Sequence, residues 1–162
     1  MFEKFGEFDS FEEINRAAAA QLKEGDTEAV LTIAEENGID KEEAEDFCAG
    51  EIGELTTATL AAVGKLNVEA EDLQLKGMML DWKDYIAERC LEERTLAIAV
   101  RKKGKRLEQC MGEILKAGFQ KKEEISQKIV KAAGLKPPIY IGMPGKAEIR
   151  KIVEKYYLGE EK

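Results

Sequence analysis

The chain has 162 residues, of which 33 are acidic and 25 basic, and its formal net charge is −8. Hydrophobic residues make up 44% and charged residues 36% of the chain, a balance that favours a folded globular protein over a disordered one. The sequence contains no histidine, which excludes His-based catalytic triads, histidine metal sites and imidazole pH switches. Its three cysteines, Cys48, Cys90 and Cys110, form no CxxC pair, so we expect reduced thiols in a cytoplasmic protein without a membrane span.

Apolar residues recur at helical spacing along nearly the whole chain, and this periodicity predicts an all-α fold, a compact bundle of about eight short helices. Ser10 and Glu13 match a capping box that starts the first helix, and Asp26 is expected to cap the second. Asp40 and Glu43 match a second capping box at the start of the third helix. These three helices predict a compact N-terminal unit.

Breaks in the helical pattern divide the rest of the chain. A helix that begins at Thr56 or Thr57 is expected to end at Gly64, with a connector over residues 65–74. Two consecutive prolines then favour an extended path over residues 139–141. Further helices are expected over residues 75–92, 95–103, 107–115, 125–133 and 146–158.

The net charge hides an uneven distribution along the chain. Residues 1–72 hold 20 acidic and 5 basic side chains, a net of −15, whereas residues 94–162 hold 8 acidic and 17 basic, a net of +9. We therefore expect an acidic N-terminal helical unit over residues 1–66. A C-terminal helical unit over residues 75–162, basic from about residue 94 onward, is expected to follow it or to pack with it as one domain. Two interpretations remain open, because oppositely charged faces can bind partners or attract each other.

The segment 34–47 has the spacing of a helix-turn-helix, but its second helix is a poor candidate for reading DNA. Residues 41–46 carry four acids and one lysine, whereas DNA phosphates require cations. The same carboxylates suggest the opposite function, in which an acidic face imitates a duplex that carries about one charge per 1.7 Å. The alternative is an ordinary solvated helix surface. The candidate partner-binding acidic face consists of Glu42, Glu43, Glu45 and Asp46.

The densest group of basic residues surrounds residue 104. It is a candidate surface for binding nucleic-acid phosphates or an acidic protein partner. The alternative is that these side chains complement a helix dipole at a helix C-terminus and cover apolar surface. This basic cluster consists of Arg101, Lys102, Lys103, Lys105 and Arg106.

No residue pattern assigns catalysis. The glycine-containing loop at residues 142–146 has the wrong spacing for a phosphate-binding loop, and Ala147 stands where a serine or threonine would bind magnesium. Paired carboxylates can hydrolyse glycosides without histidine, but nothing in the sequence singles out a pair among 33 acids. We therefore expect a protein that is not an enzyme, with no catalytic, metal-binding or cofactor-binding residues and no cofactor.

Several short segments carry a resemblance to known proteins. They are FDSFEEIN at 8–15, ENGID at 36–40, ED at 45–46, AAVGKL at 61–66, VRKKGK at 100–105 and YYLG at 156–159. These segments resemble small type II anti-CRISPR proteins from phages and mobile elements of gut Firmicutes. The resemblance spans most of the chain and implies an inhibitor of the RNA-guided DNA nuclease of the bacterial host, without assigning roles to particular residues.

The resemblance leads to a functional expectation. A non-enzymatic inhibitor in the cytoplasm of the bacterial host would bind the nuclease, or its complex with guide RNA, and block DNA binding or cleavage. Such a nuclease offers basic channels for DNA and for the RNA–DNA duplex, which an acidic face could occupy. The alternative is a nucleic-acid-binding accessory or regulatory protein of a mobile element that uses the basic C-terminal region.

Overall fold

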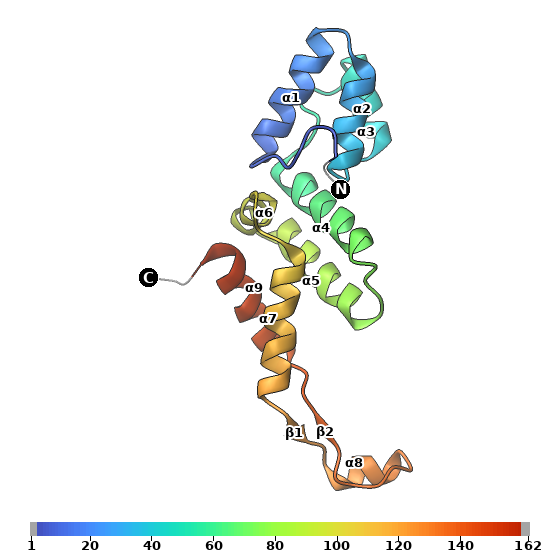
Figure 1. Cartoon of the computed structure of the whole chain (residues 1–162), viewed down its shortest axis with the longest axis vertical. Helices are drawn as coiled ribbons and strands as arrows, with labels where there is room; N and C mark the ends of the chain where they lie inside the picture. The colour runs from blue at the N-terminus through green and yellow to red at the C-terminus, as the bar shows by residue number, and fades with distance from the viewer. Residues whose placement is uncertain (1–2, 160–162) are drawn as a thin grey trace. The chain divides into compact units, whose positions relative to one another are not determined.

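The computed structural model describes residues 3–159 and divides the chain into two compact units. The first unit extends to Glu108 and the second begins at Gln109, so the division expected between residues 66 and 75 lies inside the first unit. Within the described residues the chain forms nine helices and two strands of two residues each (Figure 1). The all-α expectation is therefore confirmed.

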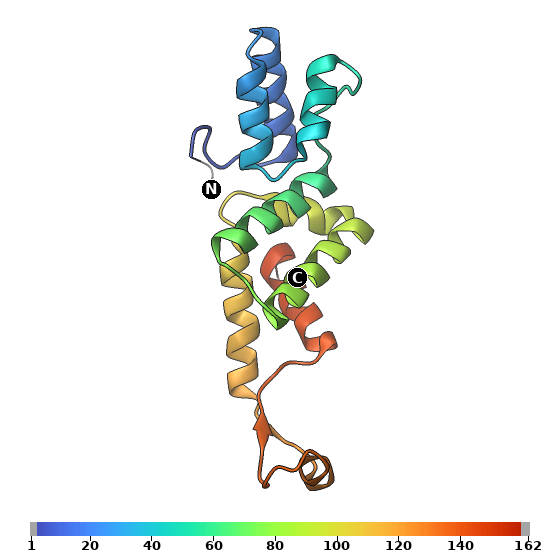
Figure 2. The same ribbon diagram turned by 90° about the vertical axis from the view of Figure 1, so that its right-hand side faces the viewer.

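The first unit contains six helices and the start of a seventh. They are α1 (Phe11–Lys23), α2 (Thr27–Glu36), α3 (Lys41–Ala49), α4 (Ala58–Asp72), α5 (Met78–Glu92), α6 (Arg94–Arg101) and α7 (Leu107–Gln120). The second unit contains the rest of α7, followed by four short elements (Figure 2). These are β1 (Glu123–Glu124), α8 (Gln127–Ala132), β2 (Tyr140–Ile141) and α9 (Lys146–Leu158).

The starts of the first three helices follow the predicted capping only in part. The Ser10 hydroxyl accepts the N–H of Glu13 at 3.2 Å, while the Glu13 carboxylate accepts the N–H of Asp9 at 2.7 Å instead of that of Ser10. The Asp26 carboxylate accepts the N–H of the third residue of α2 at 2.9 Å, as expected. The second capping box is wrong, because the Asp40 side chain makes no capping hydrogen bond at the start of α3. The Asp40 carboxylate is exposed to solvent instead.

The first three helices enclose one apolar cluster. Ile14 of α1, Val30 and Ile33 of α2 and Ala44 of α3 are completely buried in it. Phe8, which precedes α1, is partly buried against the same cluster, and the start of α4 completes it. The cluster fixes which side of α3 faces solvent.

α4 is longer than the sequence predicts. The helix was expected to end at Gly64, but it continues to Asp72 and includes most of the expected connector. A Cβ on Gly64 would lie 2.3 Å from the carbonyl oxygen of Asn37, and a Cβ on Gly38 would lie 2.3 Å from the carbonyl oxygen of Gly64. Gly64 therefore allows the backbone of α4 to approach the backbone at residues 37–38 closely. The burial of Leu66 outweighs the ~1 kcal/mol by which one glycine destabilises a helix.

The second unit holds α7 beside α9 and carries a two-stranded arm, residues 123–141, beyond the C-terminal end of α7 (Figures 1 and 2). β1 and β2 pair antiparallel, and the N–H of Ile125 donates to the carbonyl oxygen of Ile139 at 2.8 Å. The extended path expected over residues 139–141 therefore pairs with residues 123–125, of which Ile125 was assigned to a helix. At the base of the arm, Gly118 and Gly142 approach so closely that a Cβ on either would meet the other's carbonyl oxygen.

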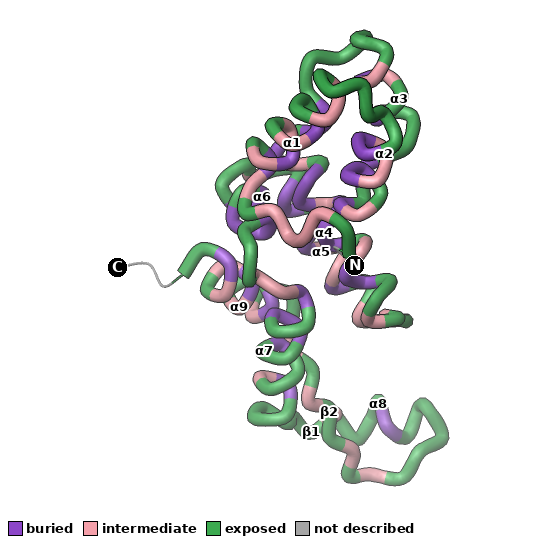
Figure 3. The backbone as a smooth tube through the Cα atoms, turned by 45° about the horizontal axis from the view of Figure 1, so that its top comes forward, coloured by how far each residue is buried: buried purple, intermediate pink, exposed green. Residues whose placement is uncertain are grey.

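Burial differs along the described chain. Figure 3 shows buried positions throughout the helices of the first unit, whereas the arm is mostly exposed, with Val130 as its buried residue. Between residues 3 and 159, no helix combines the length and apolar character needed to cross a membrane.

Candidate functional site

The acidic residues singled out from the sequence lie together at the start of α3. We define the acidic surface as Asp40, Glu42, Glu43, Glu45 and Asp46. Ala44 and Phe47 are buried on the inner side of the same helix, so the apolar core turns these carboxylates toward solvent. Glu42 and Glu45 are exposed, while Glu43 and Asp46 are half-buried.

The carboxylates of the acidic surface lie close enough to repel one another. Burial raises the pKa of Glu43, and the negative charges of Asp40 and Asp46 raise it further. The nearby cation in the sequence is Lys41, whose Nζ lies 3.1 Å from Glu45 Oε1 in an ion pair exposed to solvent. Residues 24–64 contain 12 acidic side chains and this single lysine. The acidic surface therefore lies in a region of excess negative charge, where a cationic partner would relieve the repulsion.

The basic cluster does not form one continuous surface. Lys102 and Lys103 are exposed, and Lys105 and Arg106 are half-buried. Arg101 is only 1% exposed, so its assignment to a partner-binding surface is wrong. The reason is its position in the last turn of α6, on the same side as buried Ala97 one turn earlier.

Arg101 belongs to a network of buried charges inside the first unit. Its Nη2 donates to Oδ1 of Asn37, a buried residue at the end of α2, at 2.8 Å. Burial lowers the pKa of Arg101, and the carboxylates of Glu7 and Glu69 oppose that shift. Arg101 therefore interacts with residues inside the first unit rather than with a partner at the surface.

Two residues of the expected connector complete this network. Lys65 Nζ lies 2.9 Å from Glu7 Oε1 and donates to the carbonyl oxygen of Lys102 at 2.8 Å. Glu69 Oε2 accepts the N–H of Leu107 at 2.8 Å, and its Oε1 lies 3.6 Å from Arg106 Nε. Burial lowers the pKa of Lys65 and raises that of Glu69. We call Glu7, Lys65, Glu69, Arg101 and Arg106 the buried ionic network.

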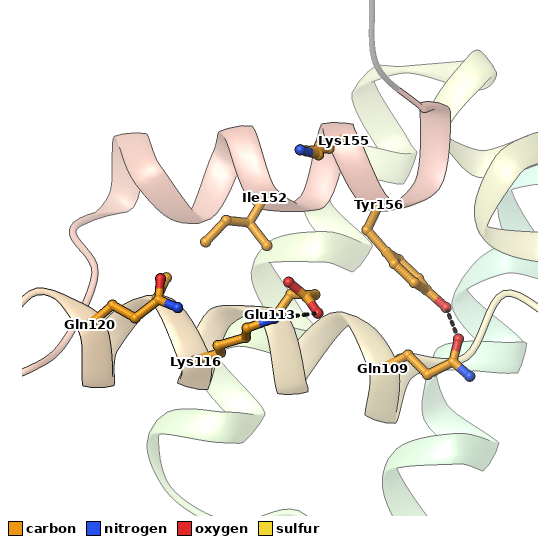
Figure 4. A pocket seen from close by; sticks show the side chains of 8 residues that line it. Gln109, Glu113, Lys116, Gln120, Ile152, Lys155 and Tyr156 are labelled. Atoms are coloured by element: carbon orange, nitrogen blue, oxygen red, sulfur yellow. Dashed lines mark hydrogen bonds and ion pairs between the residues drawn. The ribbon is translucent and has the colours of Figure 1, made fainter.

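The second unit contains a groove between α7 and α9 that the sequence did not predict (Figure 4). Its volume is about 720 Å³, and the Tyr156 hydroxyl donates to Gln109 Oε1 at 2.8 Å at one end. Glu113 and Lys116 lie 4.0 Å apart along α7. Its lining mixes both charges with amides and apolar groups, so it favours no single class of ligand. The lining residues are Gln109, Glu113, Lys116, Ala117, Gln120, Ile152, Lys155 and Tyr156.

The distribution of charge by structural unit differs from the distribution by sequence block. Residues up to 108 hold 26 acidic and 14 basic side chains, a net of −12, and residues from 109 onward hold 7 acidic and 11 basic, a net of +4. The basic cluster therefore belongs to the unit with negative net charge, where Arg106 is ion-paired with Glu69. Across residues 3–159, no three His, Cys, Asp or Glu side chains are grouped so that they could hold a metal ion.

Comparisons of the chain with protein-family models, with curated proteins and with solved structures found no match.

Proposed function

We propose that this chain is a non-enzymatic inhibitor that binds a type II CRISPR RNA-guided DNA nuclease and blocks its DNA binding or cleavage. The resemblance of segments in both units to anti-CRISPR proteins supports the choice of target. The acidic surface on α3 supports the mode of action, in which carboxylates occupy a channel that otherwise holds nucleic acid.

The observation that carries this proposal is the density of charge on the acidic surface. Five carboxylates lie within the seven residues from Asp40 to Asp46. With a helix rise of 1.5 Å per residue, seven residues give about 2.1 Å of axis per carboxylate. Duplex DNA carries about one charge per 1.7 Å of its axis. The acidic surface therefore offers a basic channel a comparable charge density on a rigid helix.

The way α3 is held favours this role. Ala44 and Phe47 anchor the helix in the apolar cluster, so the carboxylates are presented by a fixed scaffold. Binding then requires little ordering of the backbone, which lowers its entropic cost. A stoichiometric binder of this kind needs no metal, cofactor or nucleophile.

Co-elution and inhibition with matched variants test the proposal. Guide-loaded nuclease is mixed with the protein, passed over a size-exclusion column and assayed for cleavage of target DNA. We expect the wild-type protein to co-elute and to inhibit, and Glu42→Gln/Glu45→Gln to do both more weakly. Glu88→Gln/Glu92→Gln, which removes the same charge from exposed positions of α5, is the control and should behave as wild type.

The order of addition separates the two modes of inhibition. Protein added before the target DNA is expected to prevent DNA binding, whereas protein added to the preformed DNA complex should inhibit much less. The proposal would be refuted if the protein failed to co-elute with the nuclease and failed to reduce cleavage at molar excess. Equal loss of inhibition in both double variants would refute the role of the acidic surface.

A further inference from the structure

The arm of the second unit has a composition unlike the rest of the chain. Residues 125–147 contain no Asp or Glu, although 33 of the 162 residues of the chain are acidic. The same stretch holds four lysines: Lys128, Lys131, Lys136 and Lys146. It is the longest stretch of the sequence without an acid. The part of the arm beyond Glu124, residues 125–141, therefore carries three lysines and no acid, in a chain of negative net charge.

The base of the arm is fixed by backbone contacts. β1 and β2 align Glu123 with Ile141 and Glu124 with Tyr140, and the Ile125–Ile139 hydrogen bond continues the pairing toward α8. Beyond this ribbon, Lys128 and Lys131 lie on α8, and Lys136 lies in the loop that leads from α8 back to β2.

Three lysines of the arm differ from Lys121 and Lys122, which precede it. Lys121 is paired with Glu148, and Lys122 lies 5.7 Å above the ring of Phe119. By contrast, Lys128, Lys131 and Lys136 are exposed. None of the three has an ion pair, side-chain hydrogen bond or ring contact within residues 3–159. Their charges are therefore uncompensated within the described structure.

Large apolar side chains lie among these lysines. Ile129 is 62% exposed, Leu135 55% and Tyr140 56%. Exposed apolar groups beside unpaired lysines are the combination that groove-binding proteins use, with cations on phosphates and apolar groups against bases and sugars. A two-stranded ribbon also fits the major groove of B-form DNA, whereas the major groove of A-form RNA is too narrow for side chains to read.

We propose that the arm binds double-stranded DNA, with Lys128, Lys131 and Lys136 on backbone phosphates and Tyr140 against the groove. This site differs from the basic cluster, and it does not depend on the proposed inhibition of a nuclease. An anionic membrane surface also attracts lysines and apolar side chains, so it is the competing partner that the experiment must exclude.

The salt dependence of DNA binding tests the proposal. The full chain is titrated into a fluorescent 20-base-pair duplex between 50 and 200 mM salt, and anisotropy gives the affinity. Each phosphate contact contributes a slope of about −0.9 to log affinity against log salt. Lys128→Gln/Lys131→Gln/Lys136→Gln should therefore reduce the slope by about 2.7, so the wild-type affinity should fall about 40-fold more than that of the variant over this range.

A second triple variant controls for net charge. Lys23→Gln/Lys76→Gln/Lys151→Gln removes the same charge from exposed positions outside the arm and should keep the wild-type slope. Tyr140→Ala should weaken binding at every salt concentration without changing the slope. No DNA binding at 50 mM salt would overturn the proposal, as would equal slopes for the two triple variants. Lysine-dependent binding to phosphatidylserine vesicles without DNA binding would also overturn it.

Discussion

The substitution Arg101→Met tests whether Arg101 stabilises the folded protein rather than binding a partner. Methionine keeps most of the length and apolar volume of the arginine side chain but removes its charge and its hydrogen-bond donors. Because Arg101 is 1% exposed and donates to buried Asn37, the substitution removes a buried interaction without disturbing the surface. Lys102→Met, one residue further along, is the matched control at an exposed position.

The expected magnitude follows from the buried ionic network. Losing the donor leaves Asn37 Oδ1 without its 2.8 Å partner, at a cost of about 1–3 kcal/mol. It also removes a positive charge that acts on the Glu7 and Glu69 carboxylates, which are ion-paired with Lys65 and Arg106, so this loss should cost less than the about 3–5 kcal/mol of a broken buried ion pair. Nε and Nη1 of Arg101 are buried without hydrogen-bond partners in the described structure, so the variant also relieves an unfavourable desolvation. We therefore expect a net loss of about 3 kcal/mol in the free energy of unfolding.

Urea-induced unfolding followed by far-ultraviolet circular dichroism measures this loss. Wild type and both variants are compared at pH 7, with unfolding free energies extrapolated to zero urea. Lys102→Met should stay within about 0.5 kcal/mol of wild type, as is usual for surface substitutions. If Arg101→Met also stayed within that range, the predicted contribution of the buried ionic network to stability would be refuted.

Further predictions concern packing and the thiols. Gly64→Ala should lower the free energy of unfolding by about 2 kcal/mol despite the better helix propensity of alanine, because the new Cβ would lie 2.3 Å from a backbone oxygen. Gly112 is also inside a helix, but no atom lies within 4 Å of a new Cβ there, so Gly112→Ala should raise the free energy of unfolding by about 0.5–1 kcal/mol. A Gly64→Ala protein more stable to urea than the Gly112→Ala protein would contradict this explanation. Burial raises the pKa of Cys90 and of Cys110 from 9.0 to about 12, so at pH 8 iodoacetamide should alkylate Cys48 first. Equal alkylation rates at all three thiols, measured by peptide mass spectrometry, would be inconsistent with the burial of Cys90 and Cys110. Because the folded state keeps thiol protons that the unfolded state releases, stability should fall as pH rises from about 9 to 12, and Cys90→Ala/Cys110→Ala should show a shallower fall in the thermal midpoint.

Local patterns predicted the helices well because the relevant interactions are local. Ser10 and Asp26 cap the helices that they were expected to cap, and Ile14, Val30 and Ala44 lie in the core as their spacing indicated. The end of α4 was missed because Gly64 is explained by contact with a turn 26 residues earlier in the chain. The sequence around Gly64 alone does not distinguish a helix stop from a close approach.

The candidate site was predicted less evenly than the fold. The acidic surface was predicted because its acids are close together in the sequence. The apolar residues between them, Ala44 and Phe47, mark the side of the helix that faces the core. Arg101 was misassigned because its partner Asn37 is 64 residues away, so its burial has no local signal. Lys65 and Glu69 do show a signal, since cation and anion at i, i+4 spacing indicate a helix continuing through the expected connector.

Titration of the protein into guide-loaded nuclease tests the central claim most directly. The nuclease complex is held at a fixed concentration well above the dissociation constant of its complex with the protein. Cleavage of target DNA is measured after each addition. A non-enzymatic inhibitor predicts that cleavage falls in proportion to the protein added and stops at a fixed molar ratio, with no further loss on longer incubation. Full cleavage at tenfold molar excess of the protein would contradict the proposed inhibition. Inactivation of many nuclease molecules by one molecule of the protein would contradict the proposal that the protein acts by binding and not as an enzyme.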